Sequence, residues 1–202
     1  MDVPFLDHLV YATPDLAATV ADFAAATGVQ PVEGGRHDGR GTRNYLVGLG
    51  PTSYLEIIGP DVERPADPEE MPFGAGELDG PRLITWAVHP PDLDAAAAAV
   101  DLGPIQPMSR TTPAGDVLRW RLTVADPEPY DGIVPFLIDW GDTVHPAASG
   151  LPMAELLEFS ATHPDPAAVN AVLHTLGLVL PVTEGEPALT ATISGYPLHV
   201  QD

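Results

Sequence analysis

The chain has no cysteine and no lysine among its 202 residues. The absence of cysteine excludes disulfide bridges, thiolate metal sites and cysteine nucleophiles, so a metal would have to bind His, Asp or Glu. No run of eighteen apolar residues occurs, and the N-terminus lacks the basic and apolar pattern of a signal peptide. These absences predict a soluble cytoplasmic protein. The motifs of P-loop proteins, G-x-S-x-G hydrolases and H-E-x-x-H metalloproteases are also missing.

Basic residues are few, because 8 arginines stand against 29 acidic residues and give a formal net charge of −21. Nucleic acids and anionic membranes bind clustered cations, so neither is expected as a partner. A small-molecule ligand is expected instead, and homodimer formation is left open. Hydrophobic residues make up 45% of the chain, which is enough for a packed core.

The arginines nevertheless gather in two places. One group surrounds His37 in a glycine-rich segment, and the other lies on two predicted strands around Trp120: Arg36, Arg40 and Arg43; Arg110, Arg119 and Arg121. Guanidinium groups match the geometry of carboxylates, so both groups are candidate anion-binding sites. The alternative is that these arginines form salt bridges with the abundant acids. His37 is a candidate substrate-binding or acid–base group, and Asn44 could orient a substrate by hydrogen bonds.

One pattern of elements occurs three times. A short apolar strand is followed by Pro-Asp and then by a helical segment, with the aspartates at Asp15, Asp92 and Asp165. An aspartate at a helix start can accept bonds from the free N–H groups of the first turn. Three strand-like runs follow each helix, which predicts repeated βαβββ units.

We therefore predict an α+β fold of curved, mostly antiparallel sheets with three units. Residues 1–60 form the first unit, 82–141 the second and 153–202 the third, and the units are expected to pack as one globular body. Residues 61–81 are acidic and rich in Pro and Gly, so they are interpreted as a linker.

The motifs of the first two units resemble a known family. The run DHLVYATPDL opens the first unit, and GGRHDGRGTRNYLVGLG and SYLEIIGPD follow it; the second unit contains SRTTPAGDVLRWRL and PFLIDWG. Together they resemble the glyoxalase-like domain family of the vicinal-oxygen-chelate superfamily, which includes glyoxalase, extradiol dioxygenases and fosfomycin-resistance enzymes. The resemblance implies that two units pair into a cupped sheet that binds a divalent metal through the first and fourth strands of each unit.

Carrying those ligand positions over gives His8 on the first strand and Glu56 on the fourth. Imidazole and carboxylate suit Zn²⁺, Fe²⁺, Mn²⁺ or Ni²⁺. If the first two units pair, as chain order favours, Asp139 is the nearest further ligand, although a shift of one residue puts Ile138 there. If the first and third units pair, Glu158 and His199 are the corresponding residues. His8 could instead be a core histidine, and Glu56 could lie on a solvent-exposed face.

The resemblance implies a metal-dependent lyase, isomerase or dioxygenase that acts on a small oxygenated or anionic metabolite. Glu56 and His37 are the expected catalytic residues. The alternative is a non-catalytic protein of the same fold that binds or sequesters a small molecule.

Overall fold

The three helices begin where the Pro-Asp pairs predicted. A computed structural model describes residues 3–198 and contains α1 (Leu16–Thr27), α2 (Leu93–Ala99) and α3 (Pro166–Thr175). The side chains of Asp15, Asp92 and Asp165 each accept a bond from the backbone N–H three residues later. Each aspartate therefore caps an otherwise unpaired first turn, which confirms the predicted helix starts.

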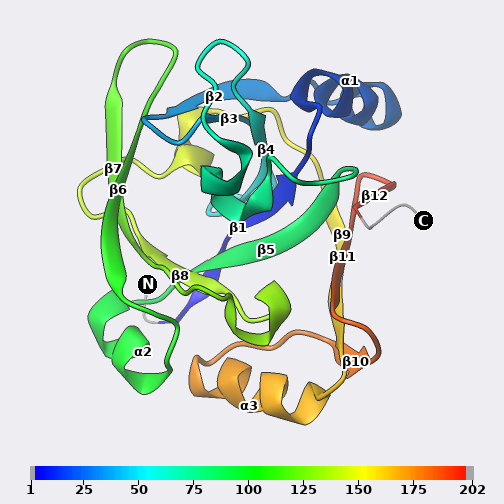
Figure 1. Ribbon diagram of the computed structural model, residues 1–202. Helices are drawn as coiled ribbons and strands as arrows, with labels where there is room; N and C mark the ends of the chain where they lie inside the picture. Colours follow the sequence, from blue (N-terminus) through cyan, green and yellow to red (C-terminus); the bar gives the residue numbers. More distant parts are fainter. Residues whose placement is uncertain (1–2, 199–202) are drawn as a thin grey trace.

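Eight strands of the first two units close into a barrel, in the order β1-β4-β3-β2-β6-β7-β8-β5 (Figure 1). The first unit supplies β1 (Phe5–Ala12), β2 (Val32–His37), β3 (Thr42–Gly48) and β4 (Tyr54–Pro60); the second supplies β5 (Arg82–His89), β6 (Ile105–Thr111), β7 (Val117–Thr123) and β8 (Phe136–Asp139). In each unit the first strand pairs in parallel with the fourth. Antiparallel β1–β5 pairing and a short β2–β6 contact join the two units.

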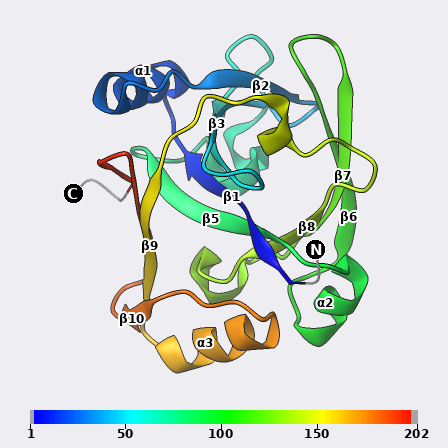
Figure 2. The ribbon, with the colours of Figure 1, turned by 180° about the vertical axis from the view of Figure 1, so that it is seen from behind.

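The third unit has the same order of elements but a different sheet. Its strands are β9 (Leu156–His163), β10 (Val182–Glu184), β11 (Ala188–Ile193) and β12 (Tyr196–Leu198). Here the first strand pairs in parallel with the second strand of the unit, and the sheet order is β10-β9-β11-β12. The sheet lies beside the barrel with α3 at one end (Figure 2). Three equivalent units are therefore not confirmed, and the predicted alternative in which the first and third units pair is wrong.

Alternation along the barrel strands separates two apolar layers. Leu9, Tyr11, Leu55 and Ile57 belong to the large core that also contains apolar residues of the helices and of the third unit. The residues between them on the same strands belong to smaller clusters inside the barrel: Val10, Ala12, Tyr54 and Ile58. Polar side chains that occupy these in-between positions on β1 and β4 therefore point into the barrel.

The acidic segment 61–81 packs against the barrel. It contains two short 3₁₀ turns, Pro68–Glu70 and Pro72–Gly74, and buries Met71 and Ala75. Phe73 and Leu78 pack on the cluster inside the barrel. Two further 3₁₀ turns lie at Pro129–Gly132 and Pro146–Ser149. The segment thus forms part of the wall at one end of the barrel.

Among residues 3–198, no helix is long and apolar enough to cross a membrane.

Candidate active site

Four polar side chains from four strands are buried inside the barrel. His8 lies on β1, Asn44 on β3, Glu56 on β4 and Arg110 on β6. Glu56 is the most exposed of the four, at 7%. Burying a carboxylate and a guanidinium in an apolar barrel is costly unless each has polar partners. Their positions therefore indicate a built site.

Glu56 is the centre of the group. Its Oε1 accepts a hydrogen bond from the Asn44 Nδ2 amide. His8 Nε2 lies 3.7 Å from Oε2, and His37 Nε2 lies 3.6 Å from Oε1. Both distances exceed those of hydrogen bonds, so the two rings flank the carboxylate without a hydrogen bond to it.

His37 is held at the edge of this group. Its Nδ1 lies 3.0 Å from the Thr42 hydroxyl, across the β2–β3 hairpin. Burial lowers the pKa of His37, and the positive charges of Arg110 and Arg40 lower it further, against the opposing effect of Glu56. The imidazole is therefore neutral at neutral pH and can accept a proton.

Arg110 brings positive charge into the barrel without a matching acid. It is 3% exposed, and its Nη1 donates to Asn44 Oδ1 at 3.5 Å. Within the described residues, no carboxylate lies within ion-pair distance of it. Gly34 makes room for it, since a Cβ there would lie 2.6 Å from Arg110 Nη1 and 2.4 Å from Asn44 Oδ1. The guanidinium is thus a candidate ligand for an anion inside the barrel.

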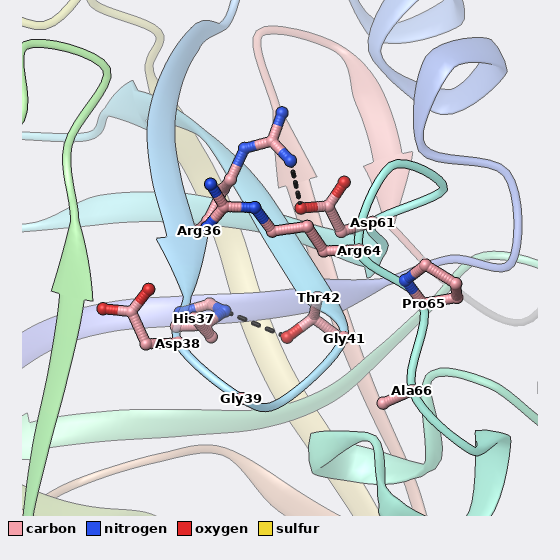
Figure 3. Close-up of a pocket in the computed structure, with 10 residues that line it drawn as sticks. All are labelled: Arg36, His37, Asp38, Gly39, Gly41, Thr42, Asp61, Arg64, Pro65 and Ala66. Atoms are coloured by element: carbon pink, nitrogen blue, oxygen red, sulfur yellow. Dashed lines mark hydrogen bonds and ion pairs between the residues drawn. The ribbon is translucent and has the colours of Figure 1, made fainter.

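A cavity of about 270 Å³ reaches His37 from the surface (Figure 3). Strand β2 supplies Arg36 and His37 on one side, and the segment after β4 supplies Asp61, Arg64 and Pro65 on the other. Because His37 also faces Glu56, its ring separates this cavity from the buried group.

The other predicted arginines have different surroundings. Arg36 is bound by Asp61 at 2.7 Å and by Glu63, so the salt-bridge alternative holds for it although it lines the cavity. Arg40 is exposed beside Met108. Arg119 and Arg121 line a separate groove of about 610 Å³ on the other face of β7. In the register with β6, Arg110 lies opposite Leu118, so Arg119 and Arg121 point away from Arg110. The expectation that Arg119 and Arg121 join Arg110 is wrong.

The weaker metal ligands do not join His8 and Glu56. Asp139 pairs with Arg121 at 2.8 Å, which holds the pKa of its carboxyl below the usual value, while the neighbouring Ile138 packs inside the barrel. Glu158 is exposed on β9, opposite Thr192 in the separate sheet. Both assignments are corrected: Glu158 because the first and third units do not pair, and Asp139 because the shift of one residue applies and Ile138 faces the barrel interior. His199 lies outside the described residues.

The donor set at Glu56 does not form a metal centre as it stands. His8 and His37 lie near different oxygens of the Glu56 carboxylate, and the Arg110 guanidinium contacts the amide that binds this carboxylate. In the described part of the chain, no three His, Asp or Glu side chains are grouped so that they could hold a metal ion.

Sequence reasoning missed Asp7, which contacts His8 from the neighbouring position. Asp7 is fully buried, and its Oδ1 lies 2.7 Å from His8 Nδ1. Alternation along a strand predicts that adjacent side chains point to opposite faces, so Asp7 was not considered. The Asp-His pair itself was the available signal, since a carboxylate often orients a functional imidazole.

Comparison with known proteins supports the fold. The family model of the glyoxalase-like domain matches residues 6–177. A search of curated proteins finds no match. A hypothetical protein from Staphylococcus aureus is 11% identical with a TM-score of 0.70, and the alignment covers 98% of this chain and 99% of that one.

Two further solved structures are methylmalonyl-CoA epimerases. The enzyme from Mycobacterium tuberculosis is 21% identical with a TM-score of 0.44, over 67% of this chain and 87% of that one. An enzyme from Streptomyces coelicolor, in complex with 2-nitronate-propionyl-CoA, is 22% identical with a TM-score of 0.45, over 70% and 98%. Given the family model that matches most of its length and the α+β barrel of paired βαβββ units, this chain belongs to the glyoxalase-like domain family of the vicinal-oxygen-chelate superfamily.

Proposed function

We propose that this protein is an enzyme that binds a small oxygenated anion inside the barrel and transfers a proton on it, as an isomerase or a lyase does. One observation carries the proposal. A buried guanidinium without a carboxylate partner in the described residues is joined through the Asn44 amide to a carboxylate that two imidazoles flank. Fold alone fixes no activity, so the argument rests on this group.

Arg110 is the proposed anion-binding residue. Its fork of N–H donors suits a substrate carboxylate, which would supply the negative charge that the guanidinium lacks. Asn44 links Arg110 to Glu56 through its amide, so it holds both side chains at fixed positions. A 2-oxo acid with its carboxylate on Arg110 would therefore place the carbon on the far side of its carbonyl near Glu56.

Glu56 is the proposed proton acceptor. Its carboxylate would take a proton from the carbon beside the substrate carbonyl, and the same proton would return to a neighbouring atom of the substrate. Neutral His37 would carry the proton between the two positions, since its Nε2 faces Glu56 and its pKa is lowered. No electrons are gained or lost in this sequence, so it needs no redox partner.

Proton transfer can be tested before the substrate is known. The protein is incubated in D₂O with a panel of small 2-oxo and 2-hydroxy acids, and ¹H NMR follows the exchange of carbon-bound protons. We expect catalysed exchange on at least one acid, and its loss in Glu56→Gln, which keeps the amide contact with Asn44. Glu184→Gln, the same change on exposed strand β10 of the separate sheet, is the matched control. Binding without exchange would contradict the enzyme and support the sequestering protein.

Metal analysis of protein purified without an affinity tag completes the test. The proposed mechanism predicts exchange that survives treatment with a chelator. Stoichiometric metal that is lost in both His8→Ala and Glu56→Ala would contradict it. That result would restore the metal-dependent lyase, isomerase or dioxygenase in which His8 and Glu56 are ligands.

A further inference from the structure

Asp7 occupies an irregular position on β1. The pairing with β5 shifts register between Leu6 and His8, so Asp7 is the extra residue of a β-bulge. The bulge lets the side chains of Asp7 and His8 meet, although they are neighbours on a strand. Asp7 Oδ1 lies 2.7 Å from His8 Nδ1, and Asp7 is 0% exposed. A buried carboxylate at a bulge beside a site residue is a feature that packing alone does not require.

The second oxygen of Asp7 has two further donors. Trp140 Nε1 donates to Oδ2 at 3.0 Å, and His145 Nε2 lies 3.0 Å from the same oxygen. The other nitrogen of His145 accepts from the Ala147 backbone N–H at 3.1 Å. The proton of His145 must therefore be on Nε2, and this imidazole is a fixed donor.

These contacts keep Asp7 ionised. Trp140 Nε1 and His145 Nε2 both donate to Oδ2, so that oxygen carries no proton, and His8 Nδ1 lies at hydrogen-bond distance from Oδ1. An ionised carboxylate can only accept hydrogen bonds. The His8 nitrogen that faces it therefore carries a proton.

The same bond decides the state of the opposite nitrogen of His8. In a neutral imidazole only one nitrogen is protonated, so a proton on Nδ1 leaves a lone pair on Nε2. Nε2 faces Glu56 and lies 3.7 Å from its Oε2. The ring is also held in place by stacking on Tyr54, with centroids 4.7 Å apart.

We infer that Asp7 is a positioning residue. With Trp140 and His145 on its other oxygen, it fixes the tautomer of His8 so that an unprotonated Nε2 faces Glu56. This inference rests on the proposed function only in the use of that lone pair. His8 then accepts a proton from the bound molecule or from Glu56, and Asp7 touches neither.

The substitution Asp7→Asn tests the inference, because the two groups of an amide differ. Its oxygen accepts hydrogen bonds and its NH₂ group donates them. Trp140 and His145 both donate to the Oδ2 position, so the amide oxygen turns toward them and the NH₂ group toward His8. His8 Nδ1 then becomes an acceptor, and the proton moves to Nε2. The tautomer therefore inverts without a change in side-chain volume.

The tautomer is read from ¹⁵N NMR of the His8 ring in alkaline buffer. We expect His8 to be protonated on Nδ1 in the unmodified protein and on Nε2 in Asp7→Asn. His145→Ala leaves the carboxylate in place and should keep the original tautomer. Asp94→Asn, an aspartate on the surface of α2, is the matched control.

An unmodified protein with His8 protonated on Nε2 would overturn the inference, and this measurement holds even if Asp7→Asn does not fold. An unchanged tautomer in folded Asp7→Asn would overturn it as well. The readout needs no substrate, so failure of the proposed function is recognised separately, by the absence of proton exchange in the unmodified protein. Once an acid that undergoes exchange is found, Asp7→Asn should lower kcat about 10²–10⁴-fold with little change in KM.

Discussion

At the residue scale, Arg110 shows how the candidate site lowers the stability of the folded protein. A guanidinium that is 3% exposed and has one amide contact at 3.5 Å carries an uncompensated desolvation cost in the absence of an anion. An apolar side chain of similar length removes that cost. Residues that are kept at such a cost are characteristic of binding sites, where stability and activity oppose one another.

Arg110→Met should therefore raise stability while it abolishes anion binding. We expect the free energy of unfolding to rise by about 1 kcal/mol or more, because a buried charge is removed. Affinity for small carboxylates should fall at least about 10-fold. Urea unfolding and calorimetric titration measure the two quantities. Arg119→Met, on the exposed face of β7, should change stability by no more than about 0.5 kcal/mol. A less stable Arg110→Met would show that the guanidinium is structurally compensated.

The lowered pKa of His37 predicts a specific loss of stability in acid. A folded-state pKa below that of the unfolded chain means that the unfolded chain binds the proton first as pH falls. The contribution of His37 is thus complete above about pH 6.5 and decreases below it, until the folded state is protonated as well. Urea unfolding at about pH 7.5 and 5.5 should show a smaller loss in His37→Gln than in the unmodified protein. His174→Gln, on the exposed side of α3, serves as the control, and an equal loss in His37→Gln would contradict the prediction.

At the scale of the elements, the barrel closes through a short contact between the two units. Strands β2 and β6 share the register pair Arg36 and Thr111. Gly35 lies beside this pair with a φ of 143°, and a Cβ there would lie 2.3 Å from the Thr111 carbonyl oxygen. A glycine at this point lets the two hairpins approach closely enough to bring Arg110 of β6 to Asn44 of β3.

Gly35→Ala should consequently disrupt the β2–β6 contact between the units. We expect a loss of about 3 kcal/mol, since a backbone clash adds to an unfavourable φ. Gly39→Ala in the same hairpin is the matched control, because its φ is 73° but nothing lies within 4 Å of the added Cβ. That variant should lose about 1 kcal/mol. Thermal unfolding compares the two variants. Equal losses of stability would show that the β2–β6 contact does not depend on close approach of the two backbones.

The elements also show how far the sequence could predict the site. Asp15 caps its helix through a contact three residues away, so local reasoning was sufficient. His8 and Glu56 were placed together because the family pattern supplied the parallel pairing of β1 and β4. Alternation indicated that Arg119 and Arg121 share a face, but which face points inward depends on closure of the barrel. Asp7 required a bulge, which no local pattern signalled.

At the scale of the whole molecule, the third unit shows that equal element order does not imply equal pairing. Both the first and the third unit follow the order strand, helix and three strands. In the first unit β1 neighbours β4, whereas in the third β9 neighbours β10 and β11. Trp86 of β5 packs edge-on against Phe159 of β9, so the third unit covers the outer side of the barrel, and none of its residues up to Leu198 contacts the group at Glu56. Such long-range packing decides which strands become neighbours. Aligning the units segment by segment gives no information about it.

The net charge of −21 predicts a whole-molecule response to salt. With 29 acidic and 8 basic residues, most carboxylates have no cation to pair with, and their mutual repulsion favours the expanded chain. Salt at about 0.1 M shortens the Debye length to about 10 Å and weakens that repulsion. It also weakens surface ion pairs such as Arg121 with Asp94, but each of these contributes only about 0–1 kcal/mol. Repulsion should dominate, so the thermal midpoint should rise between about 0.01 and 0.3 M NaCl.

Two comparisons separate screening from other effects of added solute. Equal ionic strengths of NaCl and KCl should give equal rises, because screening depends on ionic strength and not on the identity of the ion. Replacement of several exposed acids by their amides, for example at Glu69, Glu77 and Asp79, should raise the midpoint at low salt and reduce its further rise with salt. These three side chains are exposed and do not line the cavity at His37. A midpoint that falls with salt would instead show that the few ion pairs, Arg36 with Asp61 among them, outweigh the repulsion of the whole chain.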